Sequence, residues 1–472
     1  MKPTRVLTAV VVGYVLLFFW LACRKFEFSR VESGDIAVVN HVFWSSLHGK
    51  FFWHFGIDRS YFAMHQEYLL FLVWPLYALL PGPKTLFFVQ TLCIALSTVP
   101  MFLIARRVLQ DEWSAVAVAV ALIAFPSIAS QNVNQLHTSQ WVLPLLLEAF
   151  YFFLAGDFRW YAVFCVLAAM GKENTPLTLL MFVPYALWNR RERRWWLTPL
   201  VVSVVALVVD FKVVEPYFAR GWKYEALGYL SNLGNTWGEV FSALFSSKLV
   251  DALFQPANGR YILMLFQPVL WVLPLFAPEI LFAAPDVGTN LIAGNFGMKV
   301  VAWHYNVYAG AFLMLACVFA IPRLERWLGK RLGPLRLCPV TPVLLAVFAI
   351  AHWPFWFAPS QYQPLPMYDA QRLAREIIPP DASVLVGPEM LVGPFSSRLK
   401  FTTNDRLNDD PRRMFEYDYA FFDLNYGGVS PPLSRETVVA FANNPDYELV
   451  FAEQNVYVFR RKVSRLRDAV GK

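Results

Sequence analysis

Charged residues are scarce in this sequence. Asp, Glu, Lys and Arg make up 16% of its 472 residues, whereas about 25% is usual in a soluble domain. Hydrophobic residues make up 57%, and the mean hydropathy is +0.43. Several apolar runs approach the roughly 20 residues that a helix needs to cross a bilayer. These features exclude an ordinary soluble domain and predict a polytopic α-helical membrane protein.

The sequence also lacks motifs for disulfide bonds, for metal binding by cysteine and for nucleotide binding. The five cysteines show no CxxC spacing and lie in or beside apolar segments, at positions 23, 93, 165, 317 and 338. They are therefore interpreted as small buried residues. The glycines of "YGGVSPP" are followed by prolines and not by GK[ST], so this stretch is no phosphate-binding loop. The net charge of +7 fits basic cytoplasmic loops, and no nucleic acid partner is expected.

Eleven apolar segments are predicted to span the membrane. The basic run 190–194 and the basic residues at 323–336 would lie inside if the N-terminus is inside, which predicts an N-in, C-out topology. Basic residues in the long first loop oppose this assignment, but long loops carry little weight. The segment 68–83 is short and interrupted by prolines, so we expect it to be interfacial or re-entrant. The spans are expected near 6–22, 85–105, 114–130, 140–155, 160–171, 175–189, 196–214, 262–276, 279–294, 304–321 and 339–357.

The composition changes after about residue 364. Four segments have the period-2 or continuous apolar pattern of strands, namely 382–387, 419–424, 447–451 and 456–461, and the segment 431–444 is typical of a helix. We therefore predict two domains. Residues 1–360 form the transmembrane domain, with a first outer loop at 23–67, and residues 365–472 form a small extracytoplasmic α/β domain.

Polar side chains gather in the predicted outer turns. The stretch "GDIAVVNHVFWSSLHGKFF" predicts an amphipathic helix on the membrane surface with Asp35 near its start. Ionisable groups at membrane depth cost about 2.5–3.5 kcal/mol each and generally face cavities or partners. We therefore expect an outward-facing cleft with Asp35 as the catalytic residue. The expected substrate-binding residues are His41, His65, Asn134, His137, Lys172, Glu173, Lys299, His304 and Tyr305.

Structural roles remain open for several of these residues. Asp35 could simply cap the helix, and Lys172 and Glu173 could form an ion pair at a tight turn. Asp58, His65 and Glu67 are possible ligands of a divalent metal, but their spacing is generic. No metal site is assigned from the sequence, and no cofactor is certain.

The order of motifs resembles an uncharacterised prokaryotic family of multispanning membrane proteins that is grouped with the GT-C glycosyltransferases. The motifs are "GDIAVVNHVFWSSLHGKFF", "MHQEYLLFLVWPLYALLPGPKTLFFVQ", "AFPSIASQNVNQLHTSQWVLPLLL", "AAMGKENTPLTLL" and "HYNVYAGAFL". Asp35 matches the first-loop acid of GT-C enzymes. Many relatives carry paired acids there, whereas Asp35 stands between Gly34 and Ile36, which weakens the case for a metal at this acid.

The resemblance implies transfer of a sugar from a polyprenyl-phosphate carrier on the extracytoplasmic face of the cell membrane. Asp35 would be the general base, and Lys172 and Lys299, with His137 or His304, would stabilise the leaving phosphate. A single displacement predicts inversion at the anomeric carbon. The expected partners are a lipid-linked sugar donor and membrane lipids. Two alternatives remain, a transporter or flippase of a lipid-linked or anionic substrate, and a non-catalytic scaffold.

Overall fold

The chain forms two compact units in the computed structural model, which describes residues 2–31, 33–221, 226–332, 336–351, 357–403, 411–426 and 435–462. Each unit is built from segments that are far apart in the sequence. Unit 1 comprises Met1–Trp20, Phe62–Val73 and Phe87–Ala358, and unit 2 comprises Leu21–Tyr61, Trp74–Leu86 and Pro359–Lys472.

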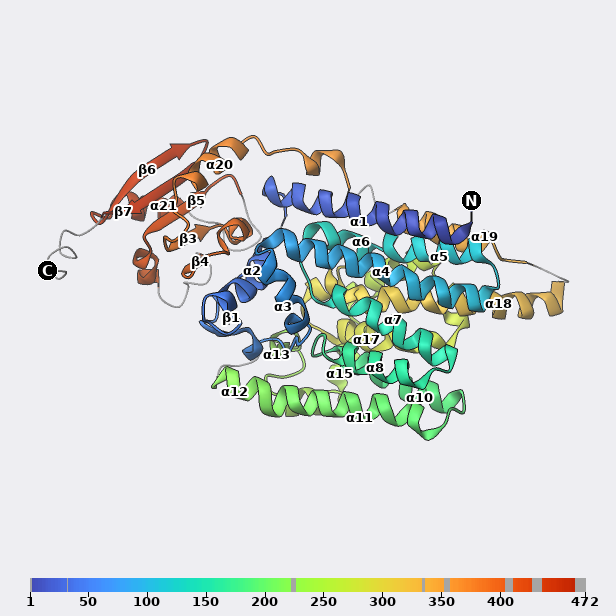
Figure 1. Cartoon of the computed structure of the whole chain (residues 1–472). Helices are drawn as coiled ribbons and strands as arrows, with labels where there is room; N and C mark the ends of the chain where they lie inside the picture. Colours follow the sequence, from blue (N-terminus) through green and yellow to red (C-terminus); the bar gives the residue numbers. More distant parts are fainter. Residues whose placement is uncertain are drawn as a thin grey trace. The chain divides into compact units, whose positions relative to one another are not determined.

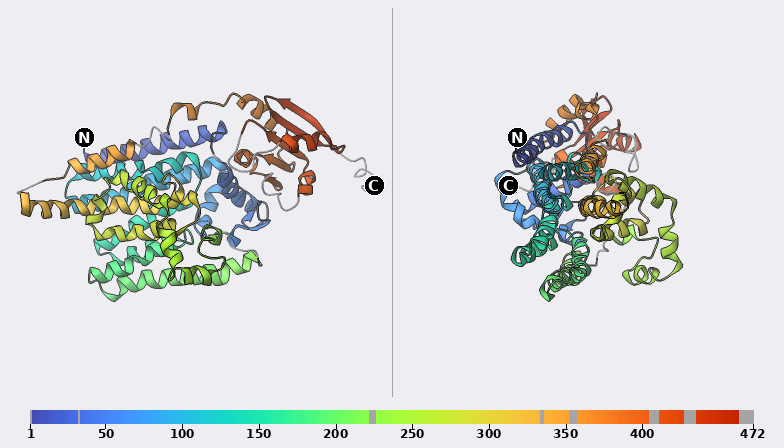
Figure 2. Two further views of the ribbon diagram at one scale, coloured as in Figure 1. Left: turned by 180° about the vertical axis from the view of Figure 1, so that it is seen from behind. Right: turned by 90° about the vertical axis from the view of Figure 1, so that its right-hand side faces the viewer.

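Unit 1 is helical. In Figure 1 its long helices run roughly parallel, and the right-hand view of Figure 2 shows several of them end-on. α1 and α4 each extend by a few residues into unit 2. The helices are α1 (Pro3–Glu27), α4 (Pro83–Leu109), α5 (Glu112–Ala124), α6 (Pro126–Asn134), α7 (Ser139–Ala155), α8 (Phe158–Ala169), α9 (Thr175–Leu180), α10 (Phe182–Trp188), α11 (Arg193–Val209), α12 (Glu215–Ala219), α13 (Ala226–Tyr229), α14 (Trp237–Ala243), α15 (Ser247–Leu253), α16 (Pro256–Phe266), α17 (Ala284–Ile292), α18 (Val307–Leu332) and α19 (Val340–Ile350).

Four helical stretches of the described residues are long and apolar enough to cross a membrane. They are Pro3–Glu27, Pro83–Leu109, Arg193–Ala219 and His304–Arg331. α5 and α6 together would make a fifth, bent by 50°. Shorter apolar helices, such as α7, α8 and α19, lie below the usual spanning length. A many-helix membrane protein is thus confirmed, and the number of eleven spans stays a prediction.

Among the described residues, several predicted spans are interrupted, and three of them show a pronounced break. The predicted span 114–130 breaks at Phe125, whose backbone is extended before Pro126, because proline disfavours the helical conformation in the preceding residue. In the predicted span 262–276, α16 ends at Phe266, and Leu270 and Trp271 have positive φ. The predicted span 279–294 consists of a 3₁₀ turn at Pro278–Ala283 followed by α17.

Unit 2 contains a five-stranded mixed sheet with the order β4-β3-β5-β7-β6 (Figure 1). β3 pairs in parallel with β4 and β5, whereas β7 pairs antiparallel with β5 and β6. All four predicted strands are confirmed, and the short β4 was missed. The strands are β3 (Val384–Gly387), β4 (Phe401–Thr403), β5 (Tyr419–Asp423), β6 (Tyr447–Glu453) and β7 (Val456–Arg461).

Alternation along the strands creates two apolar faces. On one face, Val384 and Val386 pack with Ala370 and Ala374 of α20 (Tyr368–Glu376). The opposite face, with Leu385 among its residues, packs on Phe441 of α21 (Arg435–Ala442). Within the predicted helix 431–444, residues 431–434 lie outside the described part of the chain.

Two segments from the N-terminal part of the chain, Leu21–Tyr61 and Trp74–Leu86, contribute further elements of unit 2. α2 (Gly34–Leu47) is followed by a small hairpin of β1 (Trp53–His54) and β2 (Arg59–Ser60). α3 (Leu70–Leu79) covers the segment predicted to be interfacial or re-entrant and extends into both units. Ala37 of α2 belongs to the same apolar cluster as Val384 and Val386 of β3. The helix that carries Asp35 is therefore packed on the C-terminal sheet.

Candidate functional site

Two loops of unit 1 bring four ionisable side chains together. His65 and Glu67 lie in the irregular stretch before α3, and Lys172 and Glu173 lie between α8 and α9. The backbone N–H of Leu69 donates to the carbonyl of Met170 at 2.9 Å and joins the two loops. This contact fixes the separation of residues that are more than one hundred positions apart.

Each side chain pairs with a side chain of the other loop. His65 Nδ1 lies 2.9 Å from Glu173 Oε1, and Lys172 Nζ lies 3.8 Å from Glu67 Oε1. The exposed fractions are 27% for His65 and 11% for Glu173, and 12% for Lys172 and 1% for Glu67. We call these four residues the loop cluster.

The electrostatics of the loop cluster keep Glu173 ionised. Burial by itself raises the pKa of this carboxyl, but the adjacent His65 and Lys172 more than offset burial and lower the pKa to about 2. A buried carboxylate is stable only when cations or hydrogen-bond donors compensate its charge. Glu173 is therefore an anionic acceptor over the physiological pH range.

Three further predicted residues, all with rings, lie beside this cluster. The rings of His137 and His304 lie 3.3 Å apart between centroids, and Tyr305 lies 3.9 Å from His304. His304 is also within electrostatic range of Lys172 and His65. Its Nδ1 atom is buried and has no hydrogen-bond partner among the described residues. Such orphaned groups are rare, which makes this nitrogen a candidate contact for a ligand.

Other predicted residues of unit 1 make contacts apart from the loop cluster. The amide of Asn134 donates to the carbonyl and hydroxyl of Ser130 on its own helix. The ammonium of Lys299 donates to Gln255 Oε1 at 2.8 Å. Burial lowers the pKa of Lys299. The sequence placed these residues on the outer side, but it gave no information about their partners.

Asp35 and His41 belong to unit 2 and lie on α2. Asp35 is the second residue of the helix, and the N-cap position is taken by Ser33. The alternative that Asp35 caps this helix is therefore wrong. A carboxylate in the first turn is nevertheless stabilised by the helix dipole. Ser33 makes no capping bond, because its hydroxyl donates to the carbonyl of Met390 and accepts from the N–H of Gly393.

The buried face of α2 is held by hydrogen bonds within unit 2. The amide of Asn40 donates to Ser396 Oγ at 2.8 Å, and its oxygen accepts from the hydroxyl of Tyr77 at 2.7 Å. His41 Nδ1 donates to the carbonyl of Ser396 at 3.3 Å. Both side chains are almost fully buried. α2 is thus fixed in rotation about its axis, which orients Asp35.

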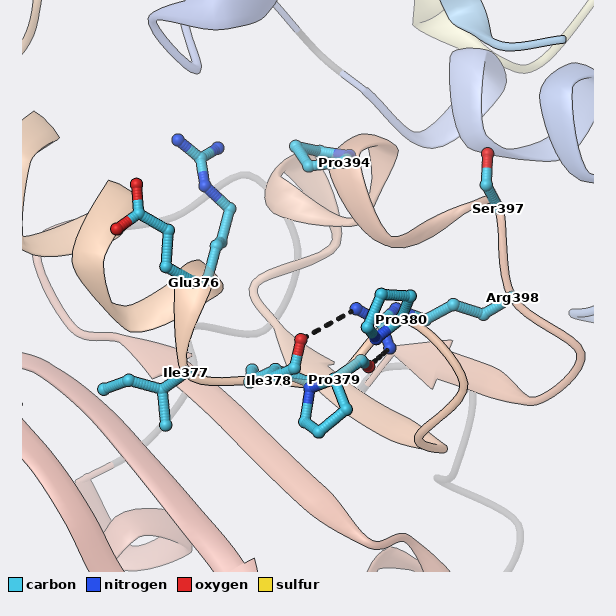
Figure 3. A pocket seen from close by; sticks show the side chains of 9 residues that line it. Glu376, Ile377, Ile378, Pro379, Pro380, Pro394, Ser397 and Arg398 are labelled. Atoms are coloured by element: carbon cyan, nitrogen blue, oxygen red, sulfur yellow. Dashed lines mark hydrogen bonds between the residues drawn. The ribbon is translucent and has the colours of Figure 1, made fainter.

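A hollow of unit 2 is lined by two arginines, and one of them is held by backbone carbonyls of the same unit. It is lined by Arg375, Glu376, Ile377, Ile378, Pro379, Pro380, Pro394, Ser397 and Arg398, as Figure 3 shows. The guanidinium of Arg398 donates to the backbone carbonyls of Ile378, Pro379 and Ala382. Since these carbonyls occupy its donors, we assign Arg398 a structural role.

Sequence reasoning missed some buried polar residues of unit 1. The predicted substrate-binding residues do not include Glu67, although the sequence suggests it as a possible metal ligand. Asp210 accepts a hydrogen bond from the hydroxyl of Tyr68 at 2.6 Å. The amide oxygen of Asn306 accepts from Tyr261 at 2.7 Å and from Asn290 at 3.1 Å. A polar residue inside an apolar run was the available signal, but a single sequence does not show which of these residues meet.

The fold resembles that of solved glycosyltransferases. The crystal structure of ArnT from Cupriavidus metallidurans bound to undecaprenyl phosphate matches with a TM-score of 0.51, 15% identity, and coverage of 96% of this chain and 98% of ArnT. The apo structure of ArnT from the same organism matches with a TM-score of 0.43, 15% identity, and coverage of 95% and 98%. ArnT is a GT-C glycosyltransferase, so the predicted GT-C-like fold is confirmed at this coarse level.

Family membership rests on the sequence itself. No curated protein matches the chain. The profile of a family described as "Predicted membrane protein (DUF2079)" matches residues 35–419, which is most of the chain. The resemblance to a multispanning membrane family grouped with the GT-C enzymes is thereby confirmed. The protein belongs to the DUF2079 family of predicted membrane proteins.

Proposed function

We propose that the protein is a membrane glycosyltransferase that moves a sugar from a polyprenyl-phosphate-linked donor to an acceptor on the extracytoplasmic face of the cell membrane. In this proposal the chain has about eleven membrane crossings, an N-in, C-out topology, and a C-terminal α/β domain outside. The observation that carries the proposal is the likeness of fold to ArnT bound to undecaprenyl phosphate, which extends over 96% of this chain.

The loop cluster and the stacked histidines support the proposal. The leaving lipid phosphate gains negative charge as the bond to the sugar breaks, and a preorganised cation stabilises that charge. Lys172 would supply the positive charge, with Lys299 as a further cation, and His137 and His304 would donate hydrogen bonds. His65, Glu173, Asn134 and Tyr305 would contact other parts of the substrate, whereas His41 is buried in unit 2 and is left out of the proposed site.

Asp35 is assigned the role of general base. Its carboxylate would take the proton from the acceptor hydroxyl as the hydroxyl oxygen attacks the anomeric carbon. The bond between the anomeric carbon and the lipid phosphate oxygen breaks in the same step, and the phosphate leaves with the electron pair. One displacement inverts the configuration at the anomeric carbon.

The substitution Asp35→Asn tests this assignment in the purified full-length protein. We expect transfer of radiolabelled sugar from a polyprenyl-phosphate donor to fall by about 10²–10⁴-fold, with little change in the unfolding temperature. The matched control is Asp58→Asn, an exposed acid of the same loop with positive φ, which asparagine tolerates. Unchanged transfer in Asp35→Asn would remove Asp35 from the mechanism.

A transporter would give a different result in the same preparation. In proteoliposomes a flippase moves labelled lipid-linked substrate across the bilayer without forming a covalent product. A transferase forms the glycosylated product, and its formation depends on Asp35. Flux without product in the wild-type protein would therefore overturn the proposed function.

A further inference from the structure

One group of potential metal ligands stands out among the residues that the structure describes. His65, Glu67 and Glu173 each offer a ligand atom, and these atoms all lie within 4.8 Å of one another. His65 and Glu67 are two residues apart in the irregular stretch before α3. Glu173 approaches from the other loop.

The distances suit a shared ion. His65 Nδ1 and Glu173 Oε1 are 2.9 Å apart. Two ligand atoms bound at about 2.0–2.2 Å to one tetrahedral ion are separated by about 3.4 Å, so a shift of about 0.5 Å would admit the ion. A ligand oxygen of Glu67 lies within 4.8 Å of the ligand atoms of His65 and Glu173.

The loops that carry these ligands are held in place independently of any ion. The Leu69–Met170 backbone bond joins them. The hydroxyls of Thr175 and Tyr308 are 3.2 Å apart and attach the start of α9 to α18. Preorganised ligands bind a metal more tightly, since less ordering is required on binding.

Charge also favours a cation at this point. Two carboxylates face one ammonium and one imidazole in a largely buried setting. Buried charges are paired or coordinate metals. The partly exposed ring of His65 leaves a route from solvent, and three protein ligands leave a coordination position open, as in many catalytic zinc sites.

We propose that His65, Glu67 and Glu173 bind one divalent transition-metal ion, with Zn²⁺ the best suited. One imidazole nitrogen and two carboxylate oxygens match the ligand preferences of Zn²⁺. Mg²⁺ and Ca²⁺ prefer sites made of oxygen atoms alone. The inference concerns metal binding and does not depend on the proposed transferase activity.

The experiment measures bound metal in the full-length protein in detergent. The protein is stripped with a chelator, dialysed against Zn²⁺ and passed over a desalting column, and its metal content is measured by mass spectrometry. We expect about one Zn²⁺ per chain and a higher unfolding temperature with Zn²⁺ than with chelator. Equal concentrations of Mg²⁺ and Ca²⁺ should give neither result.

The variants Glu173→Gln and Glu67→Gln remove a charged ligand atom and keep the side-chain volume. Each should weaken Zn²⁺ binding by at least about 10-fold. The matched control is His48→Gln, because His48 is an exposed histidine of unit 2 whose Nδ1 donates to the carbonyl of Trp44. This variant should retain the wild-type metal content.

Two outcomes would overturn the proposal. One is a wild-type protein that retains no Zn²⁺ and unfolds at the same temperature with Zn²⁺ and with chelator. The other is a Glu173→Gln variant that folds and binds Zn²⁺ as tightly as the wild type. In either case the loop cluster would hold the two loops together through its side-chain pairs and would bind no metal. The wild-type measurement decides the matter even if a variant fails to fold.

Discussion

At the scale of single residues, His41 shows how burial changes a side chain that sequence alone suggests as a ligand. Its ring lies in unit 2 against Phe401, with a centroid distance of 4.9 Å. Burial lowers the pKa of His41 to about 4, although its bond to the Ser396 carbonyl raises it and Lys50 lowers it further. The native protein therefore keeps this imidazole neutral where an unfolded chain would protonate it.

His41 makes stability depend on pH. Its pKa is near 6.5 when unfolded and about 4 when folded, so only the unfolded chain binds the proton between these values and stability falls as the pH falls. Between pH 7 and pH 4 the wild type should lose on the order of 3 kcal/mol more than His41→Asn. Thermal unfolding at both pH values measures this difference, and equal losses would contradict it.

At the scale of elements, α2 and the loop after β3 are closely packed. A Cβ atom at Gly393 would lie 2.7 Å from both Phe26 Cε2 and Ser33 Cβ. The substitution Gly393→Ala should therefore destabilise unit 2 by about 1–3 kcal/mol through overpacking.

The control for Gly393→Ala is Gly49→Asn. Gly49 has φ +81° and no atom within 4 Å, and asparagine adopts positive φ readily. Denaturation in detergent measures both variants, and equal stability of wild type and Gly393→Ala would contradict the packing.

A second contact between secondary-structure elements joins α18 to the 3₁₀ turn Pro278–Ala283, which precedes α17. Glu279, 1% exposed, accepts two hydrogen bonds from Arg323, at 2.5 and 3.0 Å, and one from Tyr185 at 2.7 Å. Glu279→Ala leaves the half-buried guanidinium of Arg323 and the hydroxyl of Tyr185 without their acceptor and should cost about 1–3 kcal/mol in the free energy of unfolding.

The exposed pair of Glu192 and Arg194 provides the control for Glu279. Its atoms are also close, at 2.9 Å, but 70% and 54% of the two side chains are exposed. Glu192→Ala should therefore cost at most about 1 kcal/mol. Similar losses for the two variants would show that burial does not strengthen the Glu279 contact.

At the scale of the whole molecule, the predicted topology places the two ends of the chain on opposite sides of the membrane. In a cysteine-free background, a single cysteine at exposed Glu453 should react with an impermeant maleimide added to intact cells. A single cysteine at exposed Glu192 should react only after the cells are opened. The reverse pattern would invert the topology. Labelling of both positions in intact cells would contradict the odd number of membrane crossings predicted between them.

The sequence determined the class of this protein because composition and periodicity are local properties. Long apolar runs require helices in a bilayer, since every backbone group must be satisfied within the segment. Strands β3, β5, β6 and β7 followed from their apolar patterns. Local patterns did not predict the breaks at Phe125 and Leu270, although nearby prolines at 126 and 268 indicated that these stretches were irregular.

Only the tertiary structure decided which side chains meet. His65 contacts Glu173 across 108 positions, and Asn40 contacts Ser396 across 356, and no local pattern records such pairs. The sequence listed Lys172 and Glu173 as neighbours, whereas the fold paired them with Glu67 and His65 of another loop. The physical reason is that apolar burial drives the helices together without regard to direction, and the polar groups enclosed by that packing must then find partners.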